Sequence, residues 1–144
     1  MALIPKITWI HPQNWDGNLP ETGPGWKKII LLLTGICTLT GDNIDETDVV
    51  KLNISELLNV NRKIPTRTAI TKIKGTVSGF RNVKLSWDRA PENDILILPR
   101  GRSSIRRIIA DPGEEGDRTG DILLSTIGAE LGASYSVEIH VRLK

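Results

Sequence analysis

The sequence contains a single cysteine, Cys37, so the chain cannot form an internal disulfide. A chain of 144 residues can still bury roughly 70% of the surface that its unfolded form exposes, which supports a core without a disulfide. The longest apolar run, residues 29–33, is far shorter than the ~20 residues of a membrane span. The N-terminal MALIPKITWIHP lacks the profile of a signal peptide. We therefore expect a soluble protein of a reducing compartment, with no membrane partner.

Motifs that would carry catalysis or hold a cofactor are also missing. No glycine-rich phosphate loop of the GxxxxGK[ST] or GxGxxG type occurs. The two histidines, His11 and His140, lie outside any metal-ligand spacing. Cys37 sits in an apolar segment, where a small buried hydrophobe is expected. We expect no enzyme activity, no catalytic residues and no cofactor.

Two acidic segments leave one alternative open. Residues 42–48 and the loop around residues 111–117 each gather several carboxylates, the ligands that Ca²⁺ prefers. Residues 42–48 lack the calcium-binding loop pattern, which has glycine at the sixth position and glutamate at the twelfth. Solvated turns are the expected state of both, with a bound cation as the alternative. We expect no metal site.

What the chain does contain is a succession of short β-type segments. Isoleucine, valine and threonine are abundant, and these β-branched residues favour a pleated, half-buried surface. The alternation of apolar and polar side chains is strongest in the last segment, where a row from Val137 to Leu143 would face one side. The predicted strands cover residues 27–40, 50–55, 67–78, 83–88, 94–98, 119–127 and 135–144, with a hairpin connection at 79–82 and a long irregular stretch at 99–118. This pattern predicts an all-β fold, a single antiparallel β-sandwich or jelly-roll-like domain over residues 27–144.

Residues 1–26 differ from the rest in composition. They hold four prolines and three of the four tryptophans, Trp9, Trp15 and Trp26. Proline removes ladder donors, so this segment cannot be a central strand. One interpretation packs the tryptophans onto their own domain. The other is an extended arm that binds a neighbour through them, because tryptophan is enriched at interface anchors; we predict this arm.

The segment 100–107 carries four arginines with no acid among them: Arg100, Arg102, Arg106 and Arg107. Nucleic-acid binding would need aromatic stacking platforms as well, and this segment has none. The net charge of +2 does not favour a nucleic-acid partner either. We predict a basic loop that binds an acidic surface of a protein partner, or residues 111–117 of a neighbouring copy.

The C-terminal two thirds resemble small virion structural proteins of marine and cyanobacterial tailed phages. The resemblance spans about residues 45–144 and rests on the segments 83–88 (VKLSWD), 119–126 (TGDILLST), 128–129 (GA) and 134–144 (SYSVEIHVRLK). It rests on strand and turn patterns, and residues 1–26 take no part in it. What the resemblance implies is a non-enzymatic role on the capsid surface.

The function expected from this resemblance is that of a capsid cement or decoration protein. Such a protein would bind the major capsid protein or another virion protein, assemble in the host cytoplasm and form a homo-oligomer, with a trimer favoured. Another virion part, such as a tail, connector or head-fibre component, is an alternative. A carbohydrate-binding adhesion sandwich is a further one, and it would require exposed aromatic residues such as Trp87 and Tyr135.

Overall fold

The computed structural model describes residues 3–11, 28–38, 43–52, 68–88, 93–110 and 121–143. These residues form strands, bends and turns. No helix long and apolar enough to cross a membrane occurs among them. The strands are β1 (Leu3–His11), β2 (Lys28–Cys37), β3 (Val49–Leu52), β4 (Thr68–Trp87), β5 (Asn93–Ile105), β6 (Ile109–Ala110), β7 (Ile122–Ile127) and β8 (Ser134–Leu143). The predicted all-β class is confirmed.

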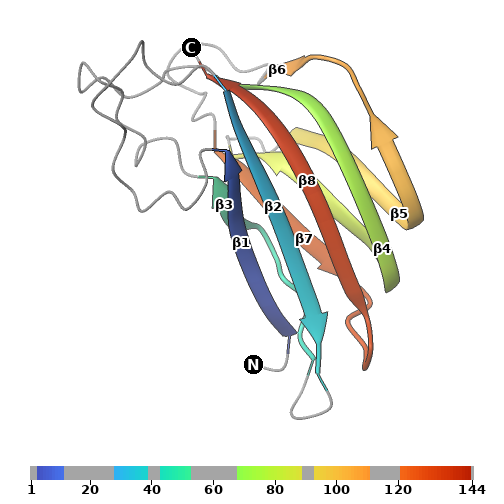
Figure 1. Cartoon of the computed structure of the whole chain (residues 1–144). Coiled ribbons are helices and arrows are strands. Elements are labelled where there is room, and N and C mark those ends of the chain that lie inside the picture. The colour runs from blue at the N-terminus through green and yellow to red at the C-terminus, as the bar shows by residue number, and fades with distance from the viewer. Residues whose placement is uncertain are drawn as a thin grey trace.

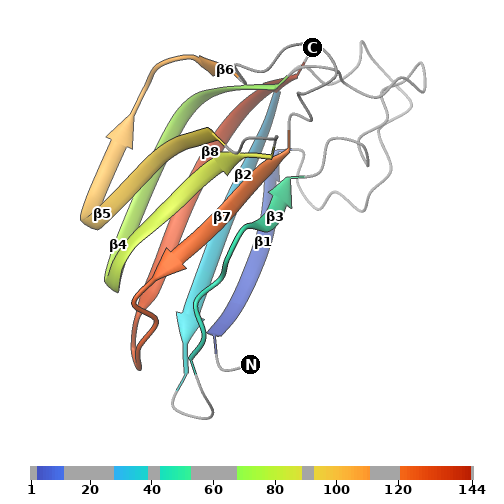
Figure 2. The ribbon, with the colours of Figure 1, turned by 180° about the vertical axis from the view of Figure 1, so that it is seen from behind.

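The strands pack as two antiparallel layers, which Figures 1 and 2 show from opposite sides. The first layer has the order β1, β2, β8 and the first half of β4, followed by the second half of β5. The second layer has the order β3, β7, the second half of β4 and the first half of β5. Because β4 and β5 belong to both layers, the structure is a β-sandwich that is closed along one side by two continuous strands.

The predicted hairpin at residues 79–82 is wrong, because β4 runs through it without a break. Val77 pairs with Gly101 and Asn82 pairs with Pro99, so four residues of β4 lie opposite the single residue Arg100. This bulge bends the strand pair from one layer to the other. Gly79 has φ +82° at the corner, a conformation that glycine adopts without strain. A corner and a hairpin use the same type of residue, so the sequence could not separate them.

The predicted irregular stretch at residues 99–118 is also corrected in part. Residues 99–105 belong to β5, and residues 109–110 form β6, which pairs with β4. The strand predicted over residues 94–98 therefore continues through Pro99. Within the described residues β5 pairs with β4 alone, and an edge strand tolerates a residue that lacks an N–H. Residues 111–118 lie outside the described part of the chain.

The first part of the predicted arm is an edge strand of the sandwich. Leu3–His11 pairs with β2 from Leu3 opposite Cys37 to His11 opposite Ile30. Among the described strands β1 lies at the edge of the sheet, and the predicted boundary at residue 27 does not separate residues 3–11 from it. Alternating apolar residues let the segment pair in spite of Pro5. Residues 12–26 lie outside the described part.

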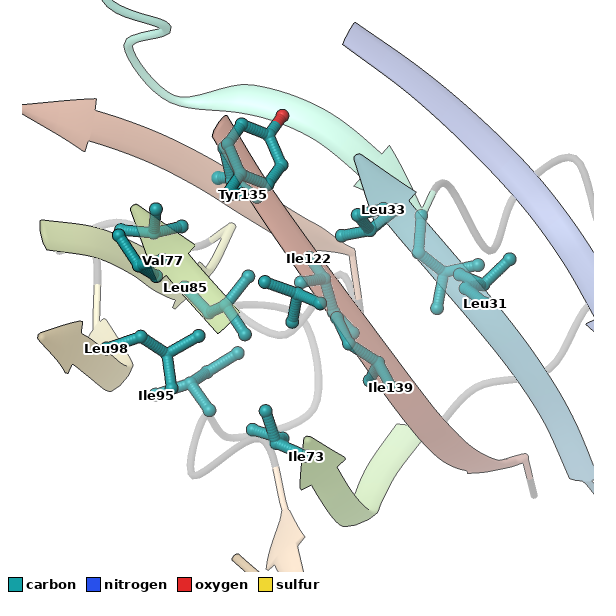
Figure 3. Packing of buried hydrophobic residues seen from close by; sticks show 14 of the residues in the cluster. Leu31, Leu33, Ile73, Val77, Leu85, Ile95, Leu98, Ile122, Tyr135 and Ile139 are labelled. Atoms are coloured by element: carbon teal, nitrogen blue, oxygen red, sulfur yellow. The ribbon is translucent and has the colours of Figure 1, made fainter. Parts of the chain in front are cut away.

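The core lies between the two layers, where side chains of both interdigitate (Figure 3). Strand β8 shows the expected alternation, because Tyr135, Val137, Ile139 and Val141 are all buried while Ser136 is exposed. Cys37 is buried and free, as expected. The largest fully buried side chains include Trp87, Phe80, Leu3, Ile29, Leu31, Leu33 and Leu85. Each such aliphatic side chain contributes about 1.5–3 kcal/mol through removal from water.

Candidate functional site

The described part of the acidic segment, residues 43–48, is hydrogen-bonded to β7 and to the residues that follow it. The Asp45 carboxylate accepts hydrogen bonds from the backbone N–H groups of Gly128 (3.1 Å) and Ala129 (2.8 Å) and from the Thr126 hydroxyl (2.9 Å). Asp48 accepts one from the Ser125 hydroxyl. Among the described residues no group of three or more histidine, cysteine or acidic side chains is placed to hold a metal ion. Asp42 and the acidic loop 111–117 lie outside that part.

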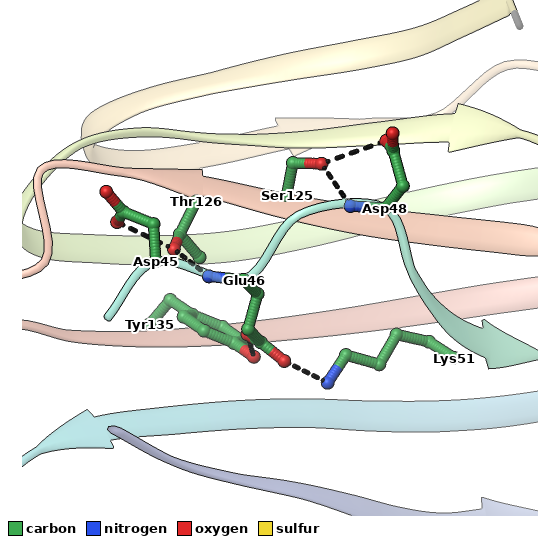
Figure 4. A network of polar contacts seen from close by, with 7 residues as sticks. All are labelled: Asp45, Glu46, Asp48, Lys51, Ser125, Thr126 and Tyr135. Atoms are coloured by element: carbon green, nitrogen blue, oxygen red, sulfur yellow. Dashed lines mark hydrogen bonds and ion pairs between the residues drawn. The ribbon is translucent and has the colours of Figure 1, made fainter. Parts of the chain in front are cut away.

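Glu46 is the centre of a buried polar network that joins the two layers (Figure 4). Its carboxylate pairs with the Lys51 ammonium at 2.5 Å and accepts a hydrogen bond from the Tyr135 hydroxyl at 2.5 Å. The Lys51 and Glu46 side chains are 3% and 2% exposed. The backbone of Glu46 exchanges hydrogen bonds with Thr126 of β7, whereas Tyr135 belongs to β8 in the other layer. The network therefore braces one layer against the other.

Tyr135 is held in its protonated form. Burial raises the pKa of its phenol well above the ordinary value of 10.0, and the hydrogen bond to Glu46 and the negative charge of that carboxylate raise it further. The ring packs against Phe80 with centroids 5.8 Å apart and covers Gly35 of the neighbouring strand, where a Cβ would lie 2.3 Å from the ring. Burial also raises the pKa of the Cys37 thiol. Both groups are set to stay neutral inside the fold.

The raised pKa of Tyr135 predicts a loss of stability in alkaline solution. Above pH ~10 the unfolded chain ionises this phenol while the folded chain does not, so the free energy of unfolding falls by about 1.4 kcal/mol per pH unit from this group. Urea unfolding of Cys37→Ala and of the double variant Cys37→Ala with Tyr135→Phe at pH 8–11 measures the difference in slope. The shared Cys37→Ala substitution removes the thiol, whose ionisation would lower the stability in the same direction. Equal slopes in the two proteins would contradict the assignment.

Neither histidine takes part in a described catalytic arrangement. His140 Nε2 lies 3.1 Å from Glu138 Oε2 on the outer face of β8, and both side chains are partly exposed. Glu138 and His140 share this face because residues two apart on a strand lie on the same side. His11 ends β1.

The tryptophans of the predicted arm fall in two groups. Trp9 lies in β1, is half-buried and packs against the core, which agrees with the interpretation that the tryptophans fold back onto their own domain. Trp15 and Trp26 lie outside the described residues. The large hydrophobic side chains that β1 exposes are isoleucines: Ile4, Ile7 and Ile10 are 57%, 40% and 39% exposed. Among the described strands β1 pairs with β2 alone and lies at the edge of the sheet.

The arginines of the predicted basic loop occupy different settings. Arg100 and Arg102 lie in β5, and Arg106 and Arg107 follow that strand as exposed residues. Arg100 donates a hydrogen bond from Nε to the carbonyl of Phe80 at 2.9 Å, which fills the corner of β4. Arg102 lines a surface depression of about 410 Å³ together with Lys74, Gly75, Thr76, Ser103 and Ser104.

Sequence reasoning missed Lys74 and Glu46. Lys74 comes close to Arg102 because β4 and β5 pair in this register, and no spacing in the sequence signals it. The segment of Glu46 was expected to be a solvated turn. An acidic residue followed five positions later by a lysine is a common pattern, so the sequence did not indicate that Glu46 and Lys51 form a buried pair.

Trp87 and Tyr135 are both buried, at 1% and 2% exposure. Phe80 is buried as well, so among the described residues the half-buried Trp9 is the most accessible aromatic side chain. The stacking platform that a sugar-binding face requires is therefore not formed by Trp87 and Tyr135.

Comparison with known proteins gives distant similarities in structure. No family model matches the sequence, and no curated protein matches it. A mutant of the family 29 carbohydrate-binding module CBM29-2 is similar with a TM-score of 0.36 and 8% identity, over 99% of this chain and 87% of that one. A structure described as CBM4 is similar with a TM-score of 0.30 and 10% identity, over 99% of this chain and 95% of the other. These values assign neither a family nor a ligand to the chain.

Proposed function

We propose that this chain is a non-enzymatic structural protein of a virus particle, a cement or decoration protein that binds the head shell. The observation that carries the proposal is the position of β1 at the edge of the described sheet, with Ile4, Ile7 and Ile10 exposed along it. An unpaired edge strand is a template for a strand of another chain. Apolar side chains beside that edge add contact area.

This edge has features that suit a specific partner. Pro5 has no N–H to donate, and Lys6 is exposed on the same strand. Both features discourage indiscriminate edge-to-edge pairing. Ile36 lies opposite Ile4 on β2 and is also 57% exposed, which widens the apolar surface beside the edge. The partner that fits is an extended segment of a shell protein.

The interior of the sandwich supports a bracing role. Two continuous strands close one side of it, and the network of Glu46, Lys51 and Tyr135 ties the layers together. A protein that reinforces a shell must keep its shape under load, and a buried, hydrogen-bonded network fixes one packing of the layers.

Two substitutions on the edge test the proposal. Ile4→Lys with Ile10→Lys places charge where apolar contact is required, so we expect binding to shells that lack the chain to fall by about tenfold or more. Co-sedimentation with purified shells measures it. The matched control is Ile97→Lys with Ile127→Lys, which changes two residues of similar exposure, 52% and 47%, in the second layer. Equal binding by the edge variant and the wild type would refute the role of β1.

The number of copies per particle separates the alternatives. Quantitative mass spectrometry of purified particles is expected to find on the order of hundreds of copies for a decoration protein, since many weak contacts are repeated over a lattice. About a dozen or fewer would place the chain in a tail or connector. Absence from particles together with tight binding in a glycan screen would instead favour the adhesion role, which the burial of Trp87 and Tyr135 makes the weaker candidate.

A further inference from the structure

A second exposed surface lies on the other side of the first layer, on the outer face of β4 and β5. Lys74 pairs with Ser104 and Thr76 pairs with Arg102, and all four side chains are exposed. They surround the depression of about 410 Å³, whose remaining lining residues are Gly75 and Ser103. The two cations thus stand diagonally across the strand pair, with a hydroxyl opposite each.

The charge of this surface is not neutralised from within the described chain. Neither Lys74 nor Arg102 forms an ion pair with another described residue. Glu138 lies opposite Lys74 on the β8 side, but it pairs with His140. One ammonium group, one guanidinium group and two hydroxyls line one open depression, and all four can donate hydrogen bonds. An anion with several acceptor oxygens is the complementary ligand.

The spacing of the cations indicates what carries the anion. Diagonal neighbours on antiparallel strands are ~7–8 Å apart. Alternate residues of an extended peptide are ~6.8 Å apart and face the same side. Two acidic side chains at alternate positions of an extended segment therefore match Lys74 and Arg102. We propose that this face is a docking site for a carboxylate-rich extended segment of a protein partner.

The setting favours carboxylates over a nucleic acid. Nucleic-acid sites combine a continuous basic track with aromatic platforms. Here the positive surface is bounded on one side by Glu138, and Phe80, Trp87 and Tyr135 are buried in the core. A small site with two cations suits two discrete carboxylates. The inference stands on this face alone and does not depend on the role proposed for the β1 edge.

The test uses the whole chain and a short peptide of alternating glutamate and threonine. Titration followed by amide chemical shifts in NMR spectra is expected to move the signals of residues 74–76 and 102–104, with binding that weakens as ionic strength rises. Lys74→Ala with Arg102→Ala is expected to weaken the affinity about tenfold or more. The spectra of the variant also report whether it is folded.

The matched control is Lys6→Ala with Arg142→Ala, which removes two exposed cations elsewhere on the outer face of the first layer. It changes the net charge equally and should bind the peptide as the wild type does. Equal weakening by both double variants would overturn the site in favour of general charge attraction. Tighter binding of oligothymidylate of the same charge at the same ionic strength would overturn the assignment to carboxylates. The absence of shifts at residues 74–76 and 102–104 would overturn it as well.

Discussion

Replacing Glu46 with alanine is expected to destabilise the fold by about 3–5 kcal/mol, because it leaves a buried charge without its partner. Lys51 is 3% exposed and pairs with Glu46, and the Tyr135 hydroxyl would lose its acceptor at the same time. Urea unfolding at pH 7 measures the loss. A total stability of ~5–15 kcal/mol is usual for a domain, so the variant would be close to unfolding.

A double variant separates the cost of leaving Lys51 without its partner from the net contribution of the ion pair. Glu46→Leu with Lys51→Met removes both charges and keeps the volume, and such exchanges of a buried pair are often neutral or stabilising. We expect the double variant to be more stable than Glu46→Ala. Asp48→Asn removes an exposed acid of the same segment and keeps a side chain that tolerates φ +48°, so it should cost about 1 kcal/mol or less. A loss below about 1 kcal/mol in Glu46→Ala would contradict the burial of the pair.

The second large effect is expected at the corner of β4. Gly79→Ala forces a side chain onto φ +82° and places its Cβ 2.7 Å from the Cα of Ala133. The left-handed conformation costs about 1–2 kcal/mol, and overpacking against backbone adds about 1–3 kcal/mol. We expect a total loss of about 2–5 kcal/mol in urea unfolding.

Gly132 provides the matched control for Gly79. It has the same φ of +82°, but a Cβ there would meet nothing within 4 Å. Gly132→Ala should therefore cost the backbone contribution alone, about 1–2 kcal/mol. If the two variants lost equal stability, the close packing of the corner on Ala133 would be disproved.

Local patterns in the sequence predicted the fold class and most strands. The alternation from Val137 onward predicted which face of β8 is buried, because a shift of one residue would turn its apolar row to solvent. The corner at Gly79 was not predictable, since its bend depends on Arg100, which lies opposite in β5. Pro99 was misleading for a similar reason, because only the position of β5 in the sheet determines that an N–H is dispensable there.

The candidate sites were less predictable than the fold. The basic segment was recognised from composition, but its partner cation Lys74 lies 28 positions before Arg102 and meets it only through strand register. Glu46 and Tyr135 come together from opposite layers. The exposed isoleucines of β1 were not predicted as a contact surface, because the prediction for this segment rested on its tryptophans. Contacts between distant segments decide all three, and a single sequence does not encode them in local spacing.

The position of β8 has a consequence for how the chain acquires its structure during synthesis. Ile29 of β2 pairs with Val141 of β8, more than a hundred residues later, and β8 lies between β2 and β4. The first layer therefore cannot assemble until β8 has left the ribosome. Until then the inward row of Ile29, Leu31 and Leu33 is uncovered, and such exposed strands are prone to aggregate. Folding of this layer is thus expected to be slow, because it waits for a pairing between segments that lie far apart in the sequence.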